Sequence, residues 1–135
     1  MILCDTGPLI ALLNANDIHH HRCLAALPTL IGPLRTTWPC FAEAMYLAGR
    51  SSGFSAQEEL WGYLGDGLLM LHRPEEAETK RMRVLMEQYR DTPMDLADAS
   101  LVAAAETLDQ RRIFTLDKHF YAYRIHDQHA FEIVP

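Results

Sequence analysis

Short apolar runs alternate with helical patterns along this chain. Runs of this kind, bounded by turn residues, are typical of buried strands. We expect strands over residues 2–4, 29–31 or 34–37, 68–71, 113–116 and 131–134. The alternation with helices predicts an α/β fold with a mainly parallel sheet. No internal repeat or long linker divides the chain, so we expect one domain over residues 1–135.

The segments between these runs carry helix signals. Proline or a capping residue opens each of them, as at Pro8, Pro39 and Pro74, or at Asp17 for residues 18–27. The sequence Ser55-Ala-Gln-Glu58 matches a capping box, which predicts a helix that starts there and ends near Gly65. The pattern after Pro74 is amphipathic, with an apolar side of residues that we expect in the core or in a dimer interface: Met82, Leu85, Met86 and Tyr89.

One predicted helix holds acids where burial is expected. Residues 93–106 read PMDLADASLVAAAE, in which Asp95 and Asp98 lie three apart at the start of a nearly apolar helix. Residues at this spacing share one side of a helix. A carboxylate there is costly to bury unless it is paired, hydrogen-bonded or bound to a cation.

Three further acids stand in comparable places. Asp5 and Asp117 each follow a predicted strand, and in parallel sheets ligands bind beyond the carboxyl ends of the strands. Glu43 is the sole charge in the apolar helix of residues 39–48, so we expect it to be at least half buried. Most other acids, Glu58 and Glu78 among them, fall on stretches that look solvated.

Carboxylates that meet at one edge raise one another's pKa, and a divalent cation removes this conflict. Oxygen ligands suit Mg²⁺ or Mn²⁺, as one ion or a pair. Each acid also has a structural interpretation. Asp95 is more often a helix N-cap than a ligand, and any one of the others could belong to a structural ion pair. Their joint placement is what favours a metal site.

Composition narrows the function classes. The chain has 135 residues, is 49% hydrophobic and carries a net charge of −6. It has no apolar stretch of the roughly 20 residues that a membrane span requires. The acidic balance argues against a broad basic surface that coats nucleic acid, but bound metal ions would leave a local nuclease site possible. Three cysteines without CxxC spacing, and an N-terminus without the basic lead-in of a secretory signal, favour a reducing cytoplasm.

With these residues in place, the sequence resembles the PIN-domain family, specifically the VapC-type toxin ribonucleases of toxin–antitoxin systems. The resemblance spans essentially the whole chain. It rests on four segments in order: ILCDTGPLIALL, PCFAEAMYLA, MDLADASLVAAAE and FTLDKHF. Any one of them is weak, but the four at these distances are fairly specific.

The resemblance implies a three-layer α/β/α sandwich and an endoribonuclease that uses Mg²⁺ or Mn²⁺. The family's acidic quartet falls on Asp5, Glu43, Asp98 and Asp117, and Asp95 matches an acid that is less uniform among relatives. These acids would hold the ions, and metal-activated water would hydrolyse the RNA phosphodiester bond. Kinship also implies a homodimer and an antitoxin protein whose tail fills the active groove.

Other residues are candidates for contact with substrate. Lys118 and His119 lie beside Asp117 in the locally basic segment 111–126, where basic and aromatic residues interleave as in sites for single-stranded RNA. Thr6 and Thr115 could hydrogen-bond a carboxylate or a phosphate, although β-branched residues are common in strands and turns for other reasons. The competing interpretation makes Phe120 and Tyr123 core residues. The run of residues 19–21, all histidine, is expected on a helix surface because consecutive helical residues cannot share one ion.

Rival functions remain open at this point. A haloacid-dehalogenase-like phosphatase would need a second aspartate two residues after Asp5, where Gly7 stands. A receiver domain would need a lysine after a late strand, and Lys118 lies too close to Asp117 for that role. The non-enzymatic alternative is a catalytically silent PIN-like module that binds RNA or protein.

Overall fold

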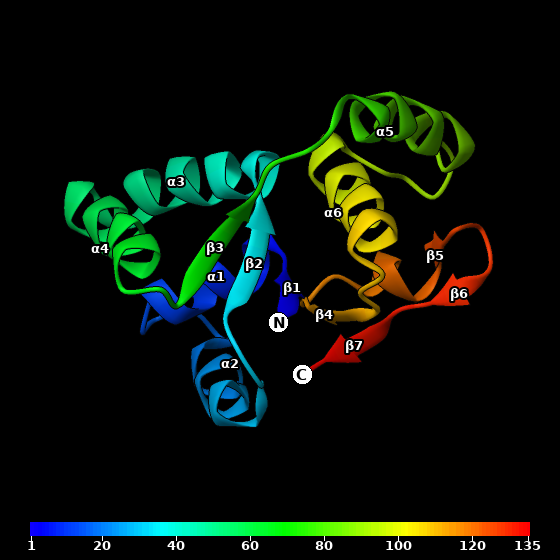
Figure 1. The fold of residues 1–135 in the computed structure, drawn as a ribbon. Helices are drawn as coiled ribbons and strands as arrows, with labels where there is room; N and C mark the ends of the chain where they lie inside the picture. Colours follow the sequence, from blue (N-terminus) through cyan, green and yellow to red (C-terminus); the bar gives the residue numbers. More distant parts are fainter.

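Five parallel strands form the centre of the computed structural model, which describes residues 1–135 (Figure 1). The strands are β1 (Ile2–Cys4), β2 (Leu34–Thr37), β3 (Leu69–His72), β4 (Arg112–Phe114) and β7 (Glu132–Val134). Their order across the sheet is β3-β2-β1-β4-β7, and every pairing is parallel. The prediction of a mainly parallel sheet is confirmed.

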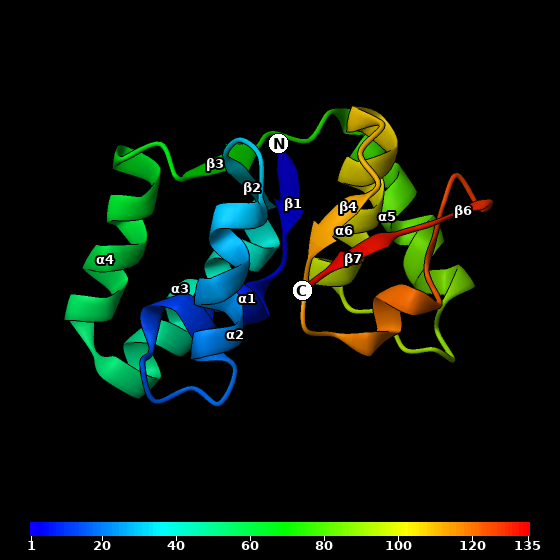
Figure 2. The same cartoon turned by 90° about the horizontal axis from the view of Figure 1, so that it is seen from below.

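Helices cover both faces of this sheet, as Figure 2 shows. One layer consists of α1 (Thr6–Leu13), α2 (His20–Ala26), α3 (Trp38–Ser52) and α4 (Phe54–Gly65). The other consists of α5 (Glu76–Gln88) and α6 (Leu96–Leu108). Alternation along β1 separates two cores, because Ile2 and Cys4 pack with the first layer whereas Leu3 packs with the second. This is the three-layer α/β/α sandwich that the resemblance implied.

Local predictions were right in kind and less accurate at the ends of elements. Residues 34–37 form the strand β2, and the alternative at 29–31 is wrong because Leu27–Thr29 is a short 3-10 helix, η1. The capping box predicted at Ser55 is also wrong. Helix α4 starts at Phe54, and Gly53, with φ of 77°, links it directly to α3. Ser55 donates its hydroxyl to the carbonyl of Ser52 instead.

The apolar side of α5 packs inside the second layer, not on an outer surface. Met82 and Leu85 are buried there, and Met86 and Tyr89 pack against the same core. Of the two interpretations of this stripe, core or dimer interface, the structure selects the core. No helix in the structure is long and apolar enough to cross a membrane.

Glu78 is buried, contrary to the prediction of a solvated stretch. Its carboxylate lies 2.8 Å from Nε2 of His72 at the end of β3, and both side chains are almost fully enclosed. Glu78 also completes a capping box with Glu75 at the start of α5. The sequence pattern of residues 74–80 did not predict the burial of Glu78, because its partner His72 lies outside the helix, at the end of β3.

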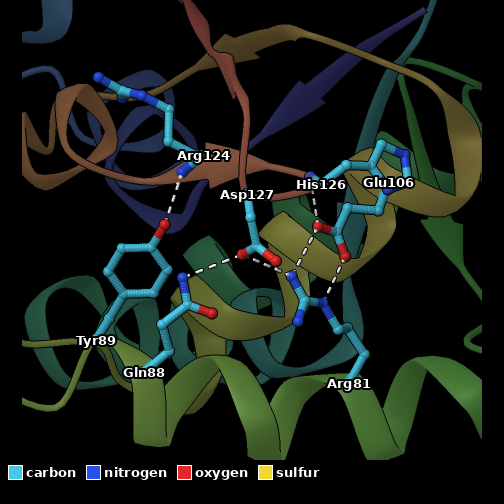
Figure 3. Close-up of polar contacts among 7 residues, drawn as sticks. All are labelled: Arg81, Gln88, Tyr89, Glu106, Arg124, His126 and Asp127. Carbon is cyan, nitrogen blue, oxygen red and sulfur yellow. Dashed lines mark hydrogen bonds and ion pairs between the residues drawn. The ribbon is translucent and has the colours of Figure 1, made fainter.

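A polar network fixes a hairpin that the sequence patterns did not predict (Figure 3). The hairpin pairs β5 (Arg124–Ile125) with β6 (His129–Ala130) through two left-handed residues, His126 and Asp127. Arg81 of α5 makes a two-pronged contact with Glu106 of α6, with N–O distances of 2.8 and 3.1 Å. The same guanidinium donates to Asp127 at 3.1 Å. The network therefore ties α5, α6 and the hairpin together.

The strand order places a ligand crevice at a definite point of the sheet. From β1 the chain moves outward through β2 and β3, and then returns to β4 on the other side of β1. In open parallel sheets the crevice forms at this reversal, beyond the carboxyl ends of the strands. Asp5 follows β1 directly, and Asp117 follows β4 after a two-residue turn. Both acids therefore border the expected crevice.

Candidate active site

A cleft of about 400 Å³ opens at this edge of the sheet. All five acids singled out by the sequence pattern line it: Asp5, Glu43, Asp95, Asp98 and Asp117. They come from four segments of the chain, namely the ends of β1 and β4, the helix α3 and the start of α6. No lysine or arginine lines this cleft.

Asp5 is the most deeply placed of these acids. Its residue follows the buried strand β1 and caps α1, which explains why the chain turns there from strand to helix. The Thr6 amide donates to Oδ1 and the Thr115 hydroxyl to Oδ2, each at 2.7 Å. Burial raises the pKa of Asp5, those two hydrogen bonds oppose the rise, and Asp117 and Asp95 add to it. Hydrogen bonds thus hold the Asp5 carboxylate in one orientation, but no lysine or arginine of the cleft pairs with it.

Asp95 and Asp98 form a reciprocal capping box at the start of α6. The Asp98 amide donates to Asp95 Oδ1 at 2.8 Å, and the Asp95 amide donates more weakly to Asp98 at 3.4 Å. The N-cap interpretation of Asp95 is therefore right, and the residue lines the cleft as well. Burial, reinforced by Asp95 and Asp5, raises the pKa of Asp98 to about 7. The Tyr123 hydroxyl, which also donates to the Pro93 carbonyl, lies 3.1 Å from Asp98 Oδ2 and steadies this carboxylate.

Glu43 and Asp117 stand at the open side of the cleft. The expectation that Glu43 is at least half buried is wrong, because its side chain is exposed together with its neighbours Tyr46 and Leu47 on α3. Partial burial still raises its pKa, with Asp95 and Asp5 adding to the effect. Asp117 caps the 3-10 helix η2 (Lys118–Tyr121), and its Oδ1 lies 2.8 Å from Nδ1 of His119.

This set of oxygen donors fits a hard divalent cation that keeps part of its water shell. Neighbouring acids add to the raised pKa values of Asp5 and Asp98, and no lysine or arginine in the cleft offsets them. No three acid, histidine or cysteine side chains converge closely enough to coordinate one ion directly. Mg²⁺ typically binds one or two carboxylates and retains waters, which suits carboxylates spread around a cleft of this size.

The four residues predicted to contact substrate do not gather at one place in the structure. Thr115 binds Asp5, as described, whereas the Thr6 hydroxyl donates to the Cys40 carbonyl and not to an acid. The His119 ring turns to Asp117 and lines neither of the two clefts of the molecule. Lys118 lies outside the acidic cleft, in a smaller neighbouring one.

Sequence reasoning missed three residues at this site. Asp17 and His19 line the cleft, although they precede α2 and carried only a capping and a surface interpretation. Tyr123 is fully buried, in line with its core interpretation, yet its hydroxyl reaches Asp98. A tyrosine in place of phenylalanine at an otherwise apolar core position was the one signal available for this contact.

The chain is similar to known proteins in sequence and in fold. The sequence is 27% identical over 135 residues to Ribonuclease VapC26 of Mycobacterium tuberculosis, which covers 99% of this chain and 100% of that protein. The crystal structure of Mycobacterium tuberculosis VapC20, described as a sarcin–ricin-loop-cleaving toxin, superposes with a TM-score of 0.84 at 17% identity, covering 90% of this chain and 94% of that one. A toxin–antitoxin complex from Klebsiella pneumoniae gives a TM-score of 0.69 at 19% identity, covering 89% and 90% of the two chains. No protein-family model matches the sequence.

The sandwich with an acidic cleft at the reversal of its parallel sheet is the PIN-domain architecture. The chain is therefore similar to VapC-type proteins, in sequence to Ribonuclease VapC26 over its whole length and in fold to VapC20.

Proposed function

We propose that this protein is an endoribonuclease that depends on Mg²⁺ or Mn²⁺ and acts as the toxin of a toxin–antitoxin pair. The observation that carries the proposal is the cleft in which five acids gather without a lysine or arginine. The similarity to Ribonuclease VapC26 and to toxin–antitoxin proteins supports the choice of RNA as substrate.

In this proposal Asp5 and Asp98 hold the cation, and Asp95, Glu43 and Asp117 surround it through water. The cation, when bound, makes coordinated water more acidic and neutralises charge on the phosphoryl group. Asp5 is suited to ligation because Thr6 and Thr115 fix both of its oxygens. The hydrogen bond from Tyr123 gives Asp98 a similar support.

Glu43 is the best-placed acceptor for the proton of the attacking water. Its carboxylate lines the cleft, is exposed and takes part in none of the hydrogen bonds or ion pairs of the structure, whereas Asp117 is engaged by His119. A raised pKa makes the Glu43 carboxylate a stronger base than an ordinary glutamate.

The partners follow from the same surface. RNA is the substrate, and the antitoxin would place a basic side chain in the cleft, where no lysine or arginine of the protein itself competes. We also propose a homodimer, which light scattering would test. Three free, buried cysteines are compatible with a cytoplasmic location.

The test is cleavage of single-stranded RNA by purified protein with Mn²⁺ or Mg²⁺ and with chelator. We expect cleavage with metal, none with chelator, and none from Asp5→Asn in either condition. Asp66→Asn, an exposed acid after α4 and outside the cleft, is the matched control and should cut like the wild type. Cleavage that persists in chelator would contradict the metal role. A folded, inhibitor-free wild type that binds RNA without cutting it would favour the silent binding module.

A further inference from the structure

A second cleft of about 100 Å³ adjoins the acidic one. Leu116 and Asp117 line both clefts, so the two lie next to each other at the β4–η2 turn. The second cleft differs in charge, because it is lined by Arg22 of α2 and Lys118 of η2. These are the lysine and arginine residues that border the site.

Both cations are available to a ligand. Arg22 is exposed, and its guanidinium makes a single long hydrogen bond, 3.4 Å, to the main-chain oxygen of Pro135. Lys118 is exposed and takes part in no ion pair of the structure. Arg81, in contrast, is fully occupied by Glu106 and Asp127. The acid that faces the two cations is Asp117, whose oxygen is already engaged by His119.

An aromatic side chain completes this second cleft. Tyr121 lines it and remains 67% exposed, whereas Phe120 and Tyr123 on either side are fully buried. The Arg124 guanidinium donates to the Tyr121 carbonyl at 2.8 Å, which fixes the backbone at this point. A large aromatic ring left in solvent on a fixed backbone, beside two free cations, is the composition of a site for single-stranded nucleic acid.

We propose that this second cleft binds the nucleotide next to the scissile phosphate of a single-stranded RNA. Arg22 and Lys118 contact the adjoining backbone phosphate, and Tyr121 stacks on the base. The proposal rests on the ribonuclease function proposed above. In this proposal, residues of α2 and η2, two segments far apart in the sequence, direct the RNA strand as it leaves the acidic cleft.

The first experiment measures equilibrium binding of a fluorescent single-stranded RNA as a function of salt, in the non-cleaving Asp5→Asn background with Mn²⁺. Each lost phosphate contact lowers the slope of log affinity against log salt by about 0.7 for single strands. Because the two cations neutralise the same phosphate, Arg22→Gln with Lys118→Gln should reduce the slope by about 0.7. Arg83→Gln with Arg90→Gln, two exposed positions on the α5 side of the molecule, removes the same charge and should leave the slope unchanged.

The second experiment tests stacking. Tyr121→Ala should weaken binding about fivefold to a hundredfold, and Tyr121→Phe should retain wild-type binding because the ring is kept. In the cleaving protein, Tyr121→Ala and Arg22→Gln should raise KM and leave kcat within about twofold, since neither residue belongs to the acidic cleft.

The outcomes separate the two proposals. If the wild type cuts RNA but Arg22, Lys118 and Tyr121 variants match the Arg83/Arg90 control, this inference is overturned and the ribonuclease function stands. If no RNA is cut, but the binding changes occur as stated, the binding site stands and the enzyme does not. A polyglutamate peptide that binds as tightly as RNA, and that responds equally to Arg22→Gln, would overturn the assignment to RNA.

Discussion

The two ends of α6 treat their acids in opposite ways. At its start, Asp95 and Asp98 face a cleft without a lysine or arginine, and the pKa of Asp98 is raised to about 7. Near its end, Glu106 receives two hydrogen bonds from Arg81, which also binds Asp127 (Figure 3). Hydrogen bonds from Gln88 and from Arg81 lower the pKa of that aspartate. One helix thus carries an uncompensated acid pair and a compensated acid.

This contrast separates acids that hold the fold together from acids that we propose to be functional. Arg81 reaches across from α5 to satisfy acids that hold the hairpin in place. At the cleft the helix N-terminus favours nearby negative charge, yet mutual repulsion and burial outweigh this at Asp98. The clustered acids of the cleft destabilise the isolated protein, and a bound cation would offset their repulsion. Clusters of this kind are typical of functional sites.

The largest expected effect is on activity, which should depend on the acids at the start of α6 and not on the acid near its end. Asp98→Asn should lower kcat/KM for RNA at least a hundredfold, since a metal ion supplies several kcal/mol of transition-state stabilisation, at about 1.4 kcal/mol for each factor of ten. Glu106→Gln should leave kcat/KM within about threefold at a temperature where the variant is folded. Equal losses of activity in both variants would erase the distinction.

The next effect is on stability. Arg81→Met removes the guanidinium from Glu106 and Asp127 and should lower the free energy of unfolding by about 2–3 kcal/mol, the range for charged hydrogen bonds. Arg83→Met, an exposed neighbour on α5 outside every ion pair, should change it by less than about 0.5 kcal/mol. Urea unfolding followed by circular dichroism measures both. Matching values for the two variants would show that the network does not stabilise the fold.

A third prediction concerns pH. The folded pKa of Asp98, about 7, lies above its ordinary value of 3.8, so the folded protein binds more protons than the unfolded chain between these pH values. Stability in chelator should therefore fall as pH rises from about 4 to about 7, and the loss should be complete above that window. Melting temperatures at pH 5 and pH 8 test this. Mn²⁺ should reduce the difference, and Asp98→Asn should remove most of it; a difference unchanged in Asp98→Asn would assign the effect to another group.

The smallest effect comes from Tyr123→Phe. The variant keeps the ring in the core but loses the hydroxyl that reaches Asp98, which should lower stability by about 0.5–1.5 kcal/mol. If the hydroxyl also orients the carboxylate, the Mn²⁺ concentration for half-maximal cleavage should rise about tenfold, in the range for outer contacts of metal ligands. Reduced stability with an unchanged Mn²⁺ requirement would limit the Tyr123 hydroxyl to a structural role, through its hydrogen bonds to the Pro93 carbonyl and to Asp98.

The sequence was sufficient for the framework of the site. Asp5 and Asp117 could be placed because apolar runs locate strands, and parallel strands bring their carboxyl ends to one edge. Asp95 and Asp98 could be placed because their helix spacing is regular. These inferences use only local pattern and the geometry of a parallel sheet.

What the sequence did not disclose depends on contacts between distant segments. Glu43 lies on the exposed side of α3, together with Tyr46 and Leu47. The composition of this helix does not specify which of its sides faces the core. Arg22 and His19 reach the site from the region of α2, and His72 contacts the Glu78 carboxylate from another element. The short hairpin near Asp127 lacks an alternating pattern, and side-chain contacts hold it.

Asp5 ends β1, caps α1 and lines the acidic cleft, but the first two of these roles need only a short polar side chain. Asparagine caps a helix as well as aspartate does, and every aspartate codon becomes an asparagine codon through one change of its first base. Under the proposed role of Asp5 in holding the cation, a single nucleotide change at this position would remove activity and keep the fold. The inactive product would then be a folded protein and not a misfolded chain.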